Sequence, residues 1–195
     1  MFALVQDGSI TKYISGNRGI TIGDIQYPQN IFTLWSAAER EAIGIYEVVF
    51  DNSNKKDEAY YINTNQSFNF ADGVVTASYG SATAKELDDR NATDDDGEEL
   101  DPVVVIEGLK TKHKKVIKKQ ASGLLEPTDW YNHKALDDDT FTIPANITTY
   151  RANIRTRSNE METAIDNASD VDALAALYVY KDGERPLGEF PILEI

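Results

Sequence analysis

The spacing of apolar residues changes near the middle of the chain. Before about residue 80 these residues form short β-branched and aromatic runs separated by Asp-Gly pairs, such as Asp7-Gly8 and Asp72-Gly73. Asp-Gly pairs favour hairpin turns because both residues tolerate the positive φ angles of a tight turn. After about residue 103 apolar residues recur every three or four positions, which is the period of an amphipathic helix. We therefore expect an α+β protein.

The domain organisation follows the same change. We predict a small β-rich N-terminal module over residues 1–81 and a helical module over residues 103–195. Between them, residues 82–102 contain the run "NATDDDGEELD", which has few apolar residues. Such a segment cannot bury enough apolar surface to offset its ordering, so we interpret it as an acidic linker or loop.

Within the first module, strands are expected near Phe2–Gln6 and Ser9–Ile14, on either side of the first Asp-Gly pair. One short helix is expected at about Ala37–Ile43. Ser36 can cap this helix, and Glu39 lies at the capping-box position three residues later.

Within the second module, the periodicity predicts an amphipathic helix from about Val104 to Leu125, with a weak interruption at Gly108. A second helix is predicted over about Ala145–Ala168, and some twenty residues join the two helices. This arrangement favours an antiparallel pair. The sequence "VDALAALY" predicts a third, short helix, and Asp182-Gly183 predicts a terminal β-hairpin.

The overall charge disfavours two classes of partner. The chain has 33 acidic and 19 basic residues, a formal net charge of −14. This charge opposes attraction to nucleic acids and to anionic membranes. The sequence contains no cysteine, which excludes disulfides and thiolate metal sites. The start of the chain does not resemble a signal peptide, and we expect a soluble protein made in the cytoplasm.

A lysine-rich stripe comes after the acidic segment. It comprises Lys110, Lys112, Lys114, Lys115, Lys118 and Lys119. The simplest interpretation is a solvated helix face. The alternatives are attraction to the neighbouring acids, contact with an acidic partner surface, or contact with a phosphate.

The sequence does not predict an enzyme. His113 and His133 are twenty residues apart, and the lysines around His113 should suppress its protonation. The chain contains no serine-hydrolase elbow, Walker loop, Rossmann glycine pattern or HExxH motif. We therefore expect no catalytic residues and no cofactor.

The acidic runs raise the question of a calcium site. Aligning Gly97 with the glycine of an EF-hand loop places Asp94 and Asp96 at ligand positions, but Ala92 and Val103 occupy two others. The run "LDDDTF" lacks a glycine turn. We interpret both runs as solvated loops without a specific metal site, with an adventitious cation as the alternative.

The sequence "SGLLEPTDWYNHK" is expected to join the two long helices. Pro127 stops the first helix, and Thr128 or Asp129 can cap the segment after it. Trp130 and Tyr131 are then expected to pack back on the helix pair.

Several of these segments resemble a known group of proteins. A lysine-rich helix followed by "LLEPTDWY", "IPANITTYRANIR" and "METAI" is similar to the C-terminal part of proteins from the tail-fibre region of tailed bacteriophages, including tail-fibre assembly proteins. The segments "LVQDGSITKY", "LWSAAEREAIGIYEV" and "DGVVTASY" resemble the front module of such proteins. The resemblance covers most of the chain except residues 89–101.

The resemblance implies a non-enzymatic tail-associated structural or tail-fibre assembly protein that acts through protein–protein contacts. The implied partner is a tail-fibre or tail-tip protein, and the implied location is the virion tail or the host cytoplasm during assembly. A transient helper and a virion component both remain open, as does homo-oligomer formation.

Five residues are expected to organise the helical module: Trp130, Tyr131, Tyr150, Arg151 and Arg155. Packing is their expected first role, and partner contact is the alternative, because Trp, Tyr and Arg are enriched in interface hot spots. The β-rich module is expected to dock on a partner strand edge.

The alternative function is a carbohydrate- or receptor-binding module of a phage tail. Tyr60, Tyr61, Phe68 and Phe70 motivate it, because exposed aromatic rings can stack on sugars. Neighbours such as Tyr60 and Tyr61 should face opposite sides of a strand, which argues against a single platform.

Overall fold

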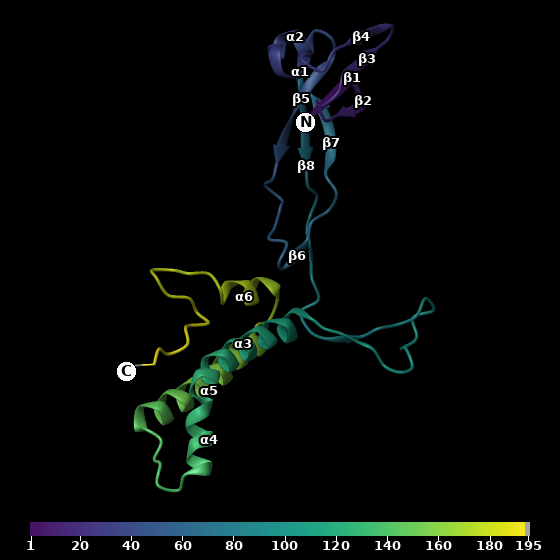
Figure 1. Ribbon diagram of the computed structural model, residues 1–195. Coiled ribbons are helices and arrows are strands. Elements are labelled where there is room, and N and C mark those ends of the chain that lie inside the picture. Colours follow the sequence, from purple (N-terminus) through teal and green to yellow (C-terminus); the bar gives the residue numbers. More distant parts are fainter. Residues whose placement is uncertain (194–195) are drawn as a thin grey trace. The chain divides into compact units, whose positions relative to one another are not determined.

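The structure, a computed structural model, describes residues 1–193. The chain forms two compact units, Met1–Thr83 and a second that begins at Ala84. Figure 1 shows that strands dominate the first unit and helices the second, which confirms the α+β class. None of the helices in the described chain has an apolar run long enough to cross a membrane.

A curled five-stranded sheet forms most of the first unit. Its strands are β1 (Phe2–Gln6), β2 (Ser9–Ile14), β5 (Ile45–Asp51), β7 (Ser67–Ala71) and β8 (Val74–Ser78). Their order is β2-β1-β5-β8-β7, and all neighbours are antiparallel except β5 and β8. The two predicted N-terminal strands are confirmed with their bounds.

Two Asp-Gly turns connect the hairpins of this sheet. Asp7 and Gly8 have φ angles of 50° and 74°, and Asp72 and Gly73 have φ angles of 51° and 76°. Both residues of each pair lie in the left-handed region that a tight hairpin turn requires. The hairpin prediction is confirmed at both sites.

The sheet buries apolar side chains on both faces. Leu4 and Ile45 belong to one buried cluster, while Ala3, Val5 and Val75 belong to another. Successive side chains of a strand point to opposite faces, so a central strand such as β1 contributes to both clusters. The ring centroids of Tyr13 on β2 and Phe68 on β7 are 4.6 Å apart, so the two edge strands approach each other.

The first unit also contains the short elements β3 (Ile20–Ile22), β4 (Ile25–Tyr27), β6 (Tyr61–Ile62), α1 (Ile31–Leu34) and α2 (Ala37–Glu41), and the two-residue strand β9 (Thr83–Ala84) spans its boundary. The capping box of Ser36 and Glu39 is present at the start of α2. The sequence missed α1, because a single helical turn is too short to show a period. Trp35 comes directly after α1, is partly buried and packs edge-on against Tyr27, with ring centroids 6.0 Å apart.

The second unit contains most of the helical residues. Its elements are β10 (Arg90–Asn91), β11 (Val105–Ile106), α3 (Leu109–Leu125), the 3-10 turn η1 (Glu126–Thr128), α4 (Asp129–Asp137), α5 (Ala145–Asp166) and α6 (Val171–Ala176). Strand β10 lies in the acidic segment expected to be a linker or loop, and it pairs with β11, which follows that segment.

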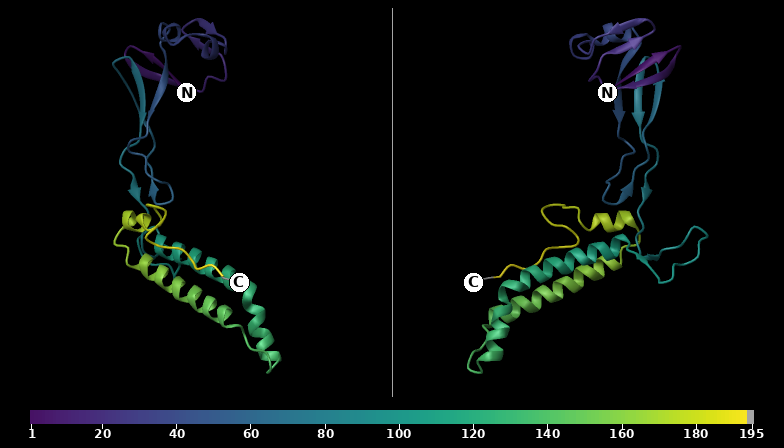
Figure 2. Two further views of the ribbon diagram at one scale, coloured as in Figure 1. Left: turned by 90° about the vertical axis from the view of Figure 1, so that its left-hand side faces the viewer. Right: turned by 45° about the vertical axis from the view of Figure 1, so that its right-hand side comes forward.

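The two long helices α3 and α5 form the predicted antiparallel pair (Figure 2). Lys114, in the first half of α3, pairs with Asp166 at the end of α5. Leu124, at the end of α3, accepts a hydrogen bond from Tyr150 near the start of α5, so the two helices run in opposite directions. The most deeply buried residues of the two helices include Ile117, Ile154, Met161 and Ile165.

The first of these helices begins later than predicted. Residues Val104 to Gly108 are not helical, and Val105–Ile106 forms strand β11 instead. Gly108 is the N-cap residue of α3, with an extended backbone. A Cβ atom at Gly108 would lie 2.4 Å from the Asp88 carbonyl group, so the chain crosses itself closely where the helix begins.

The predicted terminal hairpin is only a turn. Asp182 and Gly183 have φ angles of 55° and 88°, and an isolated bridge joins Lys181 to Glu184. Through residue 193 no strand extends this turn. The segment after the turn is held by a side chain instead, because Arg157 of α5 donates hydrogen bonds to the backbone oxygens of Leu187 and Glu189.

Candidate functional site

Arg151 of α5 is buried at the joint between α3 and α4. Its side chain is 8% exposed. Nη1 donates hydrogen bonds to the Leu125 carbonyl oxygen at 2.9 Å and to Thr128 Oγ1 at 2.6 Å, and Nη2 donates to Asp129 Oδ1 at 2.7 Å. One guanidinium group therefore bonds to the end of α3, to η1 and to the start of α4.

These bonds complete the C-terminus of α3. The last carbonyl groups of a helix have no partner within it, and Pro127 has no N–H group to offer them. The Thr128 hydroxyl donates to the Leu125 oxygen at 2.8 Å, and the Tyr150 hydroxyl donates to the Leu124 oxygen at 3.3 Å. Thr128 was predicted to cap the segment after Pro127, but it bonds to the helix before it and makes no side-chain cap on α4.

A group of three aromatic rings lies beside this network; we call Trp130, Tyr131 and Phe141 the aromatic corner. The ring centroids of Trp130 and Tyr131 are 3.8 Å apart, and Phe141 lies 6.3 Å from each. Lys134 Nζ lies 4.3 Å from the Phe141 ring centre. Trp130 is 51% exposed, and α4 has no buried residue. The rings of Trp130 and Tyr131 thus stack on each other and lie near the ring of Phe141. The expectation that Trp130 packs back into the core of the helix pair is wrong, because this side chain is half exposed.

The five predicted site residues fall into three settings. Tyr150 and Arg151 are buried at the joint, and Trp130 and Tyr131 belong to the aromatic corner. Arg155 is exposed on α5, where it donates a long 3.4 Å hydrogen bond to the Arg151 carbonyl oxygen. It therefore lies outside the Arg151 network.

Three further residues of the site were not selected from the sequence. Asp129 and Thr128 were considered only as caps, because their partner Arg151 lies more than twenty residues away in the chain. Phe141 stands in the acidic run "LDDDTF". Phe141 could have been selected from the sequence because it is an aromatic residue only about ten positions after Trp130 and Tyr131, on the segment that joins the two long helices.

The two histidines lie on different helices. The Nδ1 atom of His113 on α3 lies 2.7 Å from the Tyr178 hydroxyl oxygen. Burial lowers the pKa of His113. The sequence predicted suppressed protonation there but attributed it to the neighbouring lysines, whereas desolvation is the cause. His133 is exposed on α4.

Most of the lysine-rich stripe meets acids of the same chain. The ammonium groups of Lys110, Lys114 and Lys118 lie 3.0 Å, 2.7 Å and 3.2 Å from carboxylate oxygens of Asp88, Asp166 and Glu162, and Lys115 pairs with Glu107. The hydrogen bond from Lys114 to Asp166 raises the pKa of Lys114. Attraction to the chain's own acids is thus combined with solvation, because the side chains of Lys115 and Lys118 are 63% and 65% exposed while those of Lys110 and Lys114 are mostly covered. Lys112 and Lys119 are exposed.

The acidic runs bond to their own backbone. Asp94 Oδ1 accepts hydrogen bonds at 3.0 Å from the backbone N–H groups of Asp96 and Glu98. Asp138 accepts hydrogen bonds from the Thr140 backbone and hydroxyl, which lower the pKa of Asp138. In the described part of the chain no group of three or more His, Asp or Glu side chains could hold a metal ion.

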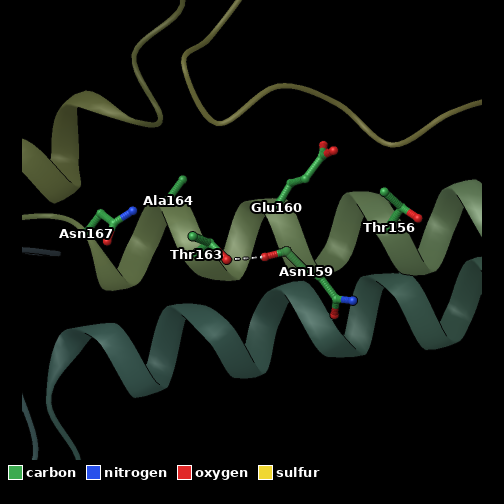
Figure 3. Close-up of a pocket in the computed structure, with 6 residues that line it drawn as sticks. All are labelled: Thr156, Asn159, Glu160, Thr163, Ala164 and Asn167. Atoms are coloured by element: carbon green, nitrogen blue, oxygen red, sulfur yellow. Dashed lines mark hydrogen bonds between the residues drawn. The ribbon is translucent and has the colours of Figure 1, made fainter.

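A hollow of about 510 Å³ runs along one face of α5 (Figure 3). Small and polar side chains line it: Thr156, Asn159, Glu160, Thr163, Ala164 and Asn167. Thr163 Oγ1 donates a hydrogen bond to the Asn159 carbonyl oxygen, and Glu160 pairs with Arg157. These residues do not combine a nucleophile with an acid and a base.

Tyr61, Phe68 and Phe70, three of the residues that motivated the sugar-binding alternative, pack within the first unit. Tyr61 is only 8% exposed. Phe68 and Phe70 pack against the buried cluster of Ala3, Val5 and Val75 and lie beside the rings of Tyr13 and Tyr46. These rings do not form the exposed platform that sugar stacking needs.

The helical joint therefore combines a buried polar network with an exposed aromatic ring. The network fixes the backbone on which Trp130 and Tyr131 stand, and Trp130 is exposed whereas Tyr131 and Phe141 are half-buried. Comparison of the chain with protein families, with curated proteins and with solved structures finds no match.

Proposed function

We propose that this protein is non-enzymatic and acts through protein–protein contacts, as a tail-associated structural or tail-fibre assembly protein of a tailed bacteriophage. The observation that carries the contact function is the aromatic corner, where Trp130 is 51% exposed although it stands beside a buried polar network. The resemblance of "LLEPTDWY" and "ITTYRANIR" to tail-fibre-region proteins supports the phage context.

The physical chemistry of the aromatic corner suits a binding surface. A large exposed ring contributes affinity when a partner covers it, and Trp and Tyr are the residue types most enriched in hot spots. Trp130 is stacked on Tyr131 before any partner arrives, so little side-chain entropy remains to be lost. The expected partner surface is an apolar pocket on a tail-fibre or tail-tip protein.

A pull-down tests this proposal. The full-length protein is co-expressed with a bacteriophage tail-fibre protein, and the affinity of the pair is measured by calorimetry. Trp130→Ala should weaken binding by about thirtyfold or more, because truncation of a hot-spot ring costs at least about 2 kcal/mol. Leu136→Ala is the matched control, since Leu136 is an 81% exposed apolar residue on the same helix.

The outcomes separate the two parts of the proposal. If Trp130→Ala binds the fibre protein as tightly as Leu136→Ala does, the aromatic corner is not the contact surface. If the unaltered protein neither binds the fibre protein nor occurs in purified virions, the tail assignment is wrong. Binding of a glycan array that Trp130→Ala abolishes would favour sugar recognition over a protein partner.

A further inference from the structure

The second unit contains an apolar strand that nothing in the described chain covers. We call residues 90–106 the acidic ribbon; they include β10, β11 and the turn between them. At its second strand, Val103, Val104, Val105 and Ile106 are 57%, 49%, 54% and 38% exposed. Among residues 1–193, β11 pairs only with β10, so the edge of β11 that faces away from β10 is open.

The open edge offers backbone hydrogen-bonding groups. The Val104 carbonyl oxygen accepts a hydrogen bond from the Ala92 N–H group at 2.7 Å, and Asn91 pairs with Val105. In an antiparallel ladder the backbone groups of successive residues point alternately toward the partner strand and away from it. The N–H and C=O groups of Val105 therefore face away from β10.

The base of the acidic ribbon is fixed to the start of α3. Asp89 accepts hydrogen bonds from the Gly108 N–H group at 2.8 Å and from the Thr111 hydroxyl at 2.9 Å. The Leu109 N–H group donates to the Glu86 carbonyl oxygen at 2.9 Å. Because one end is hydrogen-bonded to the first turn of α3 and the other runs directly into that helix, the open edge is preorganised, which lowers the cost of binding.

Charge identifies the kind of partner. The ribbon carries six acids, Asp94, Asp95, Asp96, Glu98, Glu99 and Asp101, against a single basic residue, Arg90. Two copies joined edge to edge would bring two such acidic groups together, which is unfavourable. A strand that carries lysine or arginine would instead be attracted.

We propose that the open edge of β11 binds an extended segment of another protein in which apolar residues alternate with lysine or arginine. The segment adds a third strand to the ribbon. Main-chain hydrogen bonds to Val105 contribute affinity, Val103 and Val105 contact the apolar side chains, and the net negative charge of the ribbon attracts the basic ones. This surface is separate from the aromatic corner and does not depend on the function proposed for it.

Fluorescence anisotropy with the full-length protein tests the proposal. The probe is a labelled peptide of about eight residues, the usual order of strand length, that alternates valine and lysine. A peptide that alternates valine and glutamate is the charge control. A valine–lysine peptide with N-methylated backbone is the hydrogen-bond control, because it lacks the donors that strand addition requires.

Two variants locate the binding surface. Val105→Pro removes an N–H group that points away from β10, so it should preserve the ladder and weaken binding by about fivefold, the loss expected for one main-chain hydrogen bond. Trp130→Ala should bind the peptide like the unaltered protein. Circular dichroism confirms that both variants fold.

Three results would overturn the proposal. The valine–glutamate or N-methylated peptide could bind as tightly as the valine–lysine peptide. Val105→Pro could leave binding unchanged while folding normally. Sedimentation could show a dimer that Val105→Pro dissociates, which would make the occupant a second copy of this chain.

Discussion

Strands β8 and β11 have similar apolar residues and opposite surroundings. β8 lies between β5 and β7, and its Val75 is fully buried. β11 has one neighbour, and its Val105 is 54% exposed. The comparison shows that residue type decides whether a segment can pair as a strand, while the neighbouring strands and layers decide whether it is buried. The exposed strand retains the capacity to bind.

The largest expected difference comes from the same substitution in both places. Val75→Ala should lower the free energy of unfolding by about 2 to 3 kcal/mol, because it removes two buried methyl groups and leaves a cavity. Val104→Ala should change it by less than about 0.5 kcal/mol, as is usual for an exposed site. Urea denaturation measures both. Equal losses would mean that β11 is packed in solution.

A second pair of substitutions examines the backbone of the sheet. Gly44 and Gly73 have φ angles of 80° and 76°. A Cβ atom at Gly44 would lie 2.6 Å from the Val5 carbonyl oxygen, whereas at Gly73 it would meet nothing within 4 Å. Gly73→Ala should cost about 1 kcal/mol through φ strain alone, and Gly44→Ala about 2 kcal/mol or more. Equal costs in thermal denaturation would show that the close approach to β1 is relaxed in solution.

The base of the acidic ribbon should respond to pH. Hydrogen bonds from Gly108 and Thr111 lower the pKa of Asp89 below its ordinary value of 3.8. This carboxylate therefore contributes stability above pH 3.8, and the contribution is lost as the pH falls through the folded pKa. The protection of the Gly108 amide, its exchange rate relative to that of an unstructured amide at the same pH, should fall over that acidic range.

Asp89→Ala should accelerate the exchange of Gly108 at neutral pH, where the unaltered protein is protected. Asp95→Ala, a change in the exposed turn of the ribbon, is the control. Unchanged protection in Asp89→Ala would show that the ribbon is held by other contacts.

Shortening the ribbon should have a small effect for the number of residues removed. Replacing residues 93–101 with Asn-Gly should change the free energy of unfolding of the second unit by less than about 1 kcal/mol, because loop length has a weak effect on stability. The same change removes the six acids and should weaken binding of the valine–lysine peptide. A large loss of stability would contradict the view that the ribbon packs little against its own unit.

Features set by local chemistry could be predicted from the sequence. The hairpin at Asp7-Gly8, the capping box at Ser36 and the two long helices all depend on residues a few positions apart. The segment Val104–Gly108 was misassigned, because a short apolar run has no period that separates helix from strand.

The candidate site depends on contacts that the sequence does not encode locally. Arg151 was selected by residue type, but its burial against Thr128 and Asp129 results from the antiparallel arrangement of α3 and α5. The position of the Phe141 ring beside Trp130 depends on the path of the loop after α4. The open edge of β11 was also missed, since exposure depends on which strands are neighbours and not on a strand's own residues.

The distribution of tryptophan gives each unit its own spectroscopic reporter. The chain contains two tryptophans, and Trp35 lies in the first unit while Trp130 lies in the second. Trp35 is partly buried beside Tyr27, so it should emit at shorter wavelength than the half-exposed Trp130. With Trp35→Phe or Trp130→Phe, the fluorescence of the remaining indole reports on one unit alone. The sheet of the first unit pairs residues far apart in the chain, such as Ala3 with Tyr46, and must close long loops when it folds. Trp35 should therefore report slower refolding than Trp130 does.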